Sequence, residues 1–201
     1  MKPARPAAVP ATGFCIHLRR IRQQKRARMT HARTIGEYQC WWNGASLPEL
    51  AGQMVERNGP GDNSASGVKN HRRICEGTYR LRIHAGERYM TYGYAGEGFP
   101  MPGLLLDESD TSVRSAILIH PCHHDHGYLS SIGCLNPASG LTTAASKIKL
   151  PDSRARVIAL IEAMKSRLGR AFPKQGLIPG AVIVIEGEPP PSADPAASVR
   201  K

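Results

Sequence analysis

Residues 117–137 read ILIHPCHHDHGYLSSIGCLNP, and this stretch combines a strand signal with two chemically reactive side chains. The apolar run at residues 117–119 predicts a buried strand that ends at His120. Cys134 follows His120 by 14 residues and comes directly after Gly133, which suits a tight turn. A loop of that length closes at modest entropic cost. The sequence therefore predicts that a strand end and a returning loop bring a histidine beside a cysteine.

This pair of residues indicates nucleophilic catalysis. A cysteine attacks carbonyl carbons as its thiolate and needs a neighbouring imidazole, so we expect Cys134 to be the nucleophile and His120 its general base and acid. The backbone amides of Gly133 and Cys134 are candidates for an oxyanion hole. Ser131 is expected to brace the turn through a hydroxyl hydrogen bond, and Asn136 to hold its far side.

The imidazole also needs a hydrogen-bond acceptor that fixes which of its two ring nitrogens carries the proton. A backbone carbonyl of the His120-Pro121 turn can accept the Nδ1 proton, and Asp125 is the weaker candidate for the same task. For the substrate groove the candidates are Asn136, Tyr128, Arg114 and Tyr94. Arg114 is a candidate to meet a stem carboxylate, and the favoured alternative is a solvated arginine at a strand end.

Most of the remaining segments predict strands. Asn43-Gly44 favours a hairpin turn with positive φ at both positions, within a hairpin over residues 36–50. Composition predicts a loop over residues 57–70. Alternation or apolar runs predict further strands over residues 77–84, 88–96, 113–120 and 181–188.

One segment has helical spacing. Asp152 is expected to cap a helix over about residues 153–168, with Gly169 near its end. Its predicted core residues are Val157, Leu160, Ile161, Met164 and Leu168. Strands and helices do not alternate regularly, so we predict a mainly β (α+β) fold, a small antiparallel β-barrel or sandwich with one prominent helix.

The charge is strongly positive and uneven. The chain has 201 residues, with 27 Lys and Arg against 16 Asp and Glu, and the first 34 residues hold nine basic residues and no acidic one. We therefore predict a basic disordered arm over residues 1–34, one domain over 35–187 and a disordered Pro-rich tail over 188–201. Met29 is an alternative start of translation, which would make residues 1–28 an annotation artefact.

Composition also bears on partners and location. No aromatic residue interleaves with the arginines of the arm, so nucleic acid is not the expected partner. No apolar run is long enough to span a membrane, and prolines interrupt the N-terminal segment where a signal peptide would be apolar. Five cysteines with no repeated spacing predict at least one free thiol.

The residues ILIHP and SSIGCLN resemble the catalytic motif of the L,D-transpeptidase (YkuD-type) domain. In that family a histidine is followed, after a loop, by Ser or Thr, His, Gly, Cys, an apolar residue, and Asn or Arg. His120, Ser131, Gly133, Cys134 and Asn136 match this motif. Ile132 stands where the family has a second histidine, and the loop from His120 to Cys134 is shorter than in the family. The resemblance covers roughly residues 36–187.

The resemblance implies the L,D-transpeptidase fold and chemistry on peptidoglycan. Cys134 would form a thioacyl enzyme at the L,D peptide bond of a tetrapeptide stem, and His120 would protonate the departing D-alanine. An amine acceptor gives crosslinking or D-amino-acid exchange, and water gives carboxypeptidase activity. No cofactor is implied.

Residues 64–83, SASGVKNHRRICEGTYRLRI, resemble a region of secretion-system effectors with a transpeptidase-like domain, and the Gly-Cys motif also resembles phage-associated proteins. This resemblance implies synthesis in the cytoplasm and action in the periplasm after delivery by a secretion apparatus or during lysis. The partners implied are the stem peptides, the secretion apparatus and an immunity protein.

Two other classes stay open. Residues 120–126, HPCHHDH, together with Cys134, offer ligands for a zinc-dependent amidase or peptidase: His120, Cys122, His123, His124 and His126. The third reading is a non-catalytic cell-wall-binding module. Thiol reactivity separates the three, because a catalytic cysteine is alkylated quickly and a zinc-bound one is shielded until the metal is chelated.

Overall fold

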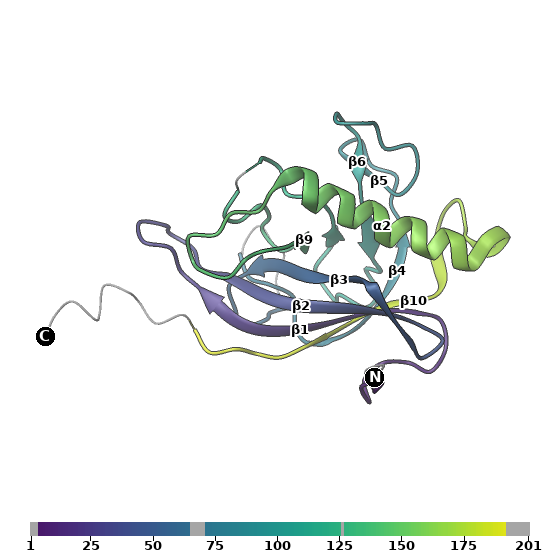
Figure 1. Ribbon diagram of the computed structural model, residues 1–201, viewed down its shortest axis with the longest axis horizontal. Coiled ribbons are helices and arrows are strands. Elements are labelled where there is room, and N and C mark those ends of the chain that lie inside the picture. The colour runs from purple at the N-terminus through teal and green to yellow at the C-terminus, as the bar shows by residue number, and fades with distance from the viewer. Residues whose placement is uncertain (1–3, 65–70, 126, 192–201) are drawn as a thin grey trace, which may run out of the picture.

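The computed structural model describes residues 4–64, 71–125 and 127–191, and its main feature is one strongly curved eight-stranded sheet (Figure 1). The strand order is β8-β7-β4-β10-β1-β2-β3-β9. The strands are β1 (Phe14–Gln24), β2 (Arg33–Trp42), β3 (Ala45–Arg57), β4 (Gly77–Ile83), β7 (Leu104–Leu106), β8 (Leu118–Ile119), β9 (Asn136–Ala138) and β10 (Leu177–Glu186).

The two edges of this sheet almost meet. Ile119 in β8 forms a parallel bridge with Leu135, the residue before β9, so the sheet is nearly closed into a barrel. All ladders of the large sheet are antiparallel except the parallel pair β1 and β10. A second small sheet joins β5 (Tyr89–Met90) to β6 (Met101–Pro102). The predicted mainly β class and the single prominent helix are therefore confirmed.

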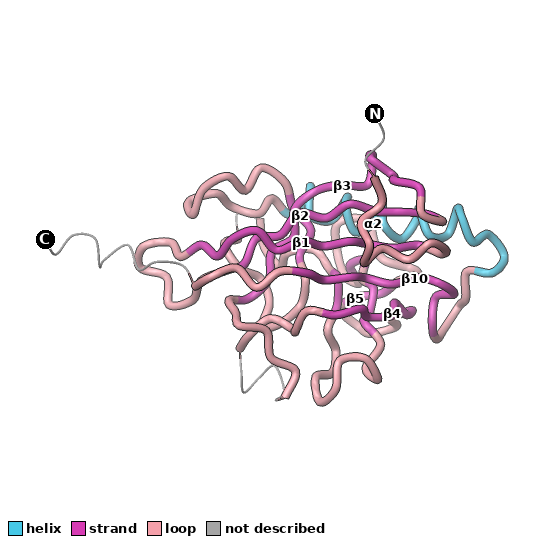
Figure 2. Tube along the Cα trace, turned by 90° about the horizontal axis from the view of Figure 1, so that it is seen from below, coloured by secondary structure: helices cyan, strands magenta, loops and turns pink. Residues whose placement is uncertain are grey.

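Helix α2 (Leu150–Leu168) covers one face of the sheet and is followed by the 3₁₀ turn η1 (Gly169–Ala171) (Figures 1 and 2). The predicted core residues Val157, Leu160, Ile161 and Met164 are fully buried in the main hydrophobic core, and Leu168 is partly buried against it. In the described part of the chain, no helix is long and apolar enough to cross a membrane.

The start of α2 differs from the prediction. The helix begins at Leu150, so Asp152 lies in its first turn. Its Oδ1 accepts a hydrogen bond from Nε of Arg156 at 3.0 Å and does not cap the helix. The cap is supplied from a distance, because Oδ1 of Asp125 accepts the backbone N–H of Leu150 at 2.9 Å. A carboxylate at this end also interacts favourably with the helix dipole.

The predicted disordered arm over residues 1–34 contains a strand, so the prediction is wrong over residues 14–24, and residues 1–3 lie outside the described residues. Residues 14–24 form β1, which pairs with β10 on one side and β2 on the other (Figure 2). Phe14, Ile16 and Leu18 alternate along this strand and are fully buried, a period of two that the dense arginines obscure.

Part of the basic charge is buried, where the prediction had placed it on a solvated arm. Arg20 in β1 forms two hydrogen bonds of 2.8 Å with the carboxylate of Glu56, and its Nη1 lies 3.1 Å from Glu188. Glu188 also pairs with Arg73. The predicted tail over 188–201 therefore does not begin at residue 188, and residues 192–201 lie outside the described part of the chain.

The other strand predictions hold in part. Asn43 and Gly44 have φ of 47° and 73°, as the predicted hairpin turn requires. Strands β4 and β10 are found where expected, and β10 begins earlier. Two other predicted strands are shorter than expected. Of residues 88–96 only 89–90 pair in a sheet, and of residues 113–120 only 118–119 do, because Gly93 and Ala116 adopt positive φ nearby. Residues 65–70 of the predicted loop lie outside the described residues.

Candidate active site

The near-closure of the barrel brings His120 and Cys134 to one place. The backbone N–H of His120 donates to the carbonyl of Leu135 at 3.0 Å, and the N–H of Leu135 donates to Leu118 at 2.8 Å. His120 directly follows β8, and Cys134 directly precedes the bridged Leu135. The 13-residue loop between them therefore returns as the sequence predicts, and both side chains line the same cavity.

His120 is held in one tautomer by its own turn. Its Nδ1 lies 2.6 Å from the carbonyl oxygen of Pro121, and a carbonyl can only accept, so Nδ1 carries the proton and Nε2 keeps its lone pair. The predicted backbone carbonyl is thus confirmed as the orienting group, while Asp125 caps α2 instead. Burial lowers the pKa of His120 to about 3, so the imidazole is neutral at pH 7.

Asn136 supports His120 from behind. Its side chain is fully buried, and Nδ2 donates to the backbone carbonyl of His120 at 2.9 Å. It cannot touch a substrate in this position, so its prediction as a substrate-binding residue is wrong. Asn136 is a positioning residue for the histidine.

Cys134 is protonated in this environment. Burial raises the pKa of its thiol to about 11, against the opposing effects of the Leu118 N–H and the charge of Arg114. Its Sγ accepts from the N–H of Leu118 at 3.4 Å and donates to the carbonyl of Ala116 at 3.6 Å. Among the described residues, no hydrogen bond joins Sγ to the ring of His120.

The turn before Cys134 has the predicted brace. Oγ of Ser131 donates to the carbonyl of Cys134 at 2.7 Å. Within the described ranges the backbone N–H groups of Gly133 and Cys134 donate to no protein acceptor; Cys134 lines the cavity, and Gly133 is buried beside it.

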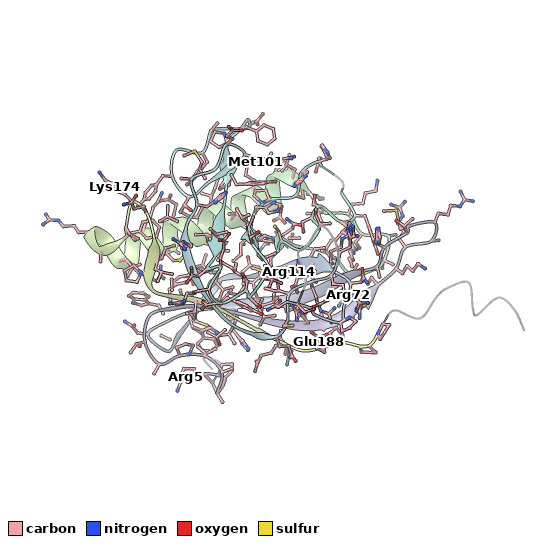
Figure 3. All side chains as sticks on the ribbon, turned by 180° about the vertical axis from the view of Figure 1, so that it is seen from behind. Arg5, Arg72, Met101, Arg114, Lys174 and Glu188 are labelled. Atoms are coloured by element: carbon pink, nitrogen blue, oxygen red, sulfur yellow. The ribbon has the colours of Figure 1, made fainter. Side chains whose placement is uncertain are left out.

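Arg114 lies in the interior of the molecule (Figure 3), with its guanidinium against Gly133, and is not part of the cavity wall. It is 1% exposed, and Nη1 donates to the backbone carbonyls of Asp62, Arg72 and Arg73 at 3.0, 2.8 and 3.1 Å. Its Nε and Nη2 have no acceptor among the described residues. Arg114 therefore places a positive charge under the Gly133-Cys134 turn, and its predicted contact with a substrate carboxylate is wrong.

The two tyrosine predictions have different outcomes. Tyr128 lines the cavity with His120 and Cys134, while its hydroxyl donates to the carbonyl of Gln24 at 2.6 Å. Tyr94 is not part of the cavity wall, because its hydroxyl donates to Glu162 on α2 at 2.9 Å. Its prediction as a substrate-groove residue is wrong.

The cavity has a volume of about 490 Å³ and contains side chains that the sequence did not single out. Tyr89 is one of them, and its ring lies 4.3 Å from the ring of His120, centroid to centroid. Arg57, Arg88 and His31 also line it, although they are distant in the sequence. No local pattern marks these residues, since only the tertiary fold brings the strand β5 and the end of β3 to this cavity.

The histidine-rich loop does not converge on a metal. Cys122 is buried and its Sγ donates to the carbonyl of His124 at 3.3 Å, while Nδ1 of His123 lies 3.2 Å from Arg88. Among the described residues, no three His, Cys, Asp or Glu side chains are placed to hold an ion. His126, a ligand in the zinc hypothesis, lies outside the described residues. All five cysteines are free thiols.

A scan against protein-family models, a search of curated proteins and a search of solved structures each found no match to this chain.

Proposed function

We propose that the protein is a cysteine-dependent acyltransferase or hydrolase of the L,D-transpeptidase type, acting on the L,D peptide bond of peptidoglycan tetrapeptide stems. The observation that carries the proposal is the shared cavity of Cys134 and His120, with Nδ1 of His120 fixed by the Pro121 carbonyl. Nε2 is then the free base that a neighbouring thiol requires. The motif of His120, Ser131, Gly133, Cys134 and Asn136 supports the family assignment.

The reaction begins from a neutral pair. With thiol and imidazole pKa values of about 11 and 3, no thiolate–imidazolium pair is stored in the free protein. The Cys134 proton therefore passes to Nε2 of His120 as the sulfur attacks the carbonyl carbon, after the thiol leaves the carbonyl of Ala116. The oxyanion that forms accepts from the amides of Gly133 and Cys134.

The second half of the reaction releases the products. His120 protonates the departing D-alanine nitrogen as the carbon–nitrogen bond breaks, which leaves a thioester on Cys134. Water or an amine then attacks the thioester and gives its proton to Nε2 of His120; the carbon–sulfur bond breaks, the acyl product leaves, and His120 returns the proton to the Cys134 sulfur. Since peptidoglycan lies outside the cytoplasmic membrane, the proposal includes delivery by a secretion apparatus or release during lysis.

The experiment is incubation of the purified protein, and of Cys134→Ala, with tetrapeptide muropeptides, with products identified by mass spectrometry. Loss or exchange of D-alanine by the wild type, absent in Cys134→Ala and unchanged by a chelator, is the expected result. No product from the wild type would overturn the proposal. Turnover that a chelator stops would favour the zinc hypothesis instead.

A further inference from the structure

The charge of the cavity wall is one-sided. Arg57 and Arg88 both line the cavity with Cys134, and no Asp or Glu of the described chain does. The other ionisable wall residues are His31, His120 and His123 together with the tyrosines. The wall therefore presents cationic groups and no carboxylate to balance them, and a concave site of one charge sign concentrates ligands of the opposite sign.

Arg88 is an exposed side chain that lies over two aromatic rings and has no anionic partner among the described residues. Its guanidinium carbon lies 5.4 Å from the ring centroid of Phe99 and 5.9 Å from that of Tyr89. Its Nη2 lies 3.2 Å from Nδ1 of His123. Among the described residues it forms no ion pair with a carboxylate.

Arg88 also lies on the histidine side of the cavity. The Tyr89 ring that it contacts lies 4.3 Å from the ring of His120, and the ring of His123 lies 5.4 Å from that of His120, centroid to centroid. A ligand group bound to Arg88 is therefore close to the base that would act on the substrate.

Arg57 provides a second, more deeply buried cation. It is 7% exposed, its Nε has no acceptor in the described part of the chain, and Nη2 faces only Nδ1 of His71 at 3.3 Å. An unpartnered buried guanidinium is costly unless an anion balances it. Two arginines of the cavity wall, Arg57 and Arg88, therefore favour an anionic ligand.

We propose that the cavity binds its substrate through a carboxylate, which Arg88 anchors by fork-like hydrogen bonds while Arg57 supplies supporting charge. The proposal rests on the proposed function, because the Cys134-His120 pair acts on acyl groups and so favours a carboxylate on an acyl compound over an inorganic anion. A planar guanidinium matches a carboxylate with two parallel hydrogen bonds. The volume of about 490 Å³ suits a short peptide end.

The first test compares alkylation of Cys134 by iodoacetate and by iodoacetamide, two reagents of similar size that differ in charge. We expect the ratio of their rate constants at Cys134 to exceed the ratio at the partly exposed Cys75 by about tenfold or more, since cationic clefts concentrate anions to that extent. Arg88→Gln should remove most of this preference, and Arg88→Lys should retain part of it. Arg170→Gln, the same charge change at an exposed site outside the cavity wall, is the matched control.

The second test measures binding without chemistry. Acetyl-L-alanyl-D-alanine, which carries an L,D peptide bond, and its carboxamide are titrated into Cys134→Ala and into Cys134→Ala/Arg88→Gln, with binding followed by NMR. Tighter binding of the acid than of the amide, lost in the double variant, is the expected result.

The outcomes separate the two proposals. A Cys134 inert toward both reagents contradicts the proposed function, and the peptide titration then decides the carboxylate site alone. Equal iodoacetate preference at Cys134 and Cys75, an equal loss of preference in Arg170→Gln, or equal binding of acid and amide would each overturn the carboxylate site.

Discussion

The guanidinium of Arg114 occupies the space that a side chain at Gly133 would need: a Cβ atom built there lies 2.0 Å from Nη2 of Arg114. Glycine at this position is therefore a packing requirement and not only a source of backbone freedom. The close approach places a buried positive charge directly against the turn that carries Cys134.

The first prediction concerns Gly133→Ala. Arg114 is anchored by three carbonyls and cannot withdraw freely, so the added methyl should lower the free energy of unfolding by about 1–3 kcal/mol, as overpacking does. It should also slow alkylation of Cys134, because the turn is displaced. Denaturant unfolding and iodoacetamide kinetics measure the two effects. Gly96→Ala, where nothing lies within 4 Å of the added atom, is the control, and equal behaviour of both variants would contradict the prediction.

The second prediction concerns the charge of Arg114. Its positive charge lowers the thiol pKa of Cys134 against the larger effect of burial, so Arg114→Met should raise that pKa further and shift the alkylation profile to higher pH. Loss of the bonds to three buried carbonyls should also destabilise the fold by about 2 kcal/mol or more.

Arg114→Lys separates the effect on the thiol pKa from the effect on stability, because lysine keeps the positive charge but lacks the planar guanidinium that bonds the three carbonyls. It should destabilise the fold while shifting the pH profile less than methionine does. Identical pH profiles for wild type and Arg114→Met would show that the charge does not act on the thiol.

The third prediction concerns stability against pH. His120 has a pKa of about 3 in the fold and an ordinary value of 6.5, so the unfolded chain binds the extra proton between these limits. The free energy of unfolding should therefore fall as the pH decreases from about 6.5 to 3, by up to about 1.4 kcal/mol per pH unit from this residue. Above pH 6.5 the residue contributes no slope. Denaturation of the wild type and of His120→Gln across this range checks it, and equally steep curves would refute the assignment.

The fourth prediction concerns Asn136. Asn136→Ala removes the donor to the His120 carbonyl, leaves that carbonyl unpaired in the interior, and should cost about 1–3 kcal/mol of stability. Muropeptide turnover should fall while the iodoacetamide reactivity of Cys134 is kept, because the histidine and not the thiol loses its support. Equal losses of both activities would point to a general structural effect.

The fifth prediction concerns Tyr94→Phe. The change removes the hydrogen bond to Glu162 and should cost about 1 kcal/mol of stability or less. Turnover and thiol reactivity should stay at wild-type levels, since Tyr94 is not part of the cavity wall. Impaired turnover by a well-folded Tyr94→Phe protein would restore Tyr94 to the substrate groove.

The sequence by itself determined the local elements whose signals are local. The Asn43-Gly44 turn, the alternation in β4 and the helical spacing from Val157 to Met164 each follow from backbone sterics and side-chain periodicity. The association of His120 with Cys134 was also predictable, because a short loop joins a strand end to a glycine turn. The Ser131 brace and the carbonyl at Pro121 belong to the same local geometry.

The tertiary structure alone decided the features that depend on distant partners. The arginines of residues 14–24 suggested a solvated arm, but Glu56 and Glu188 neutralise Arg20 inside the fold, so the strand could be buried between β2 and β10. Arg114 is interior because backbone carbonyls of a remote loop accept hydrogen bonds from its guanidinium. Tyr94 faces α2 because Glu162 accepts a hydrogen bond from its hydroxyl. Charge is a property of one residue, whereas its burial depends on which partners the closed sheet brings within hydrogen-bonding distance.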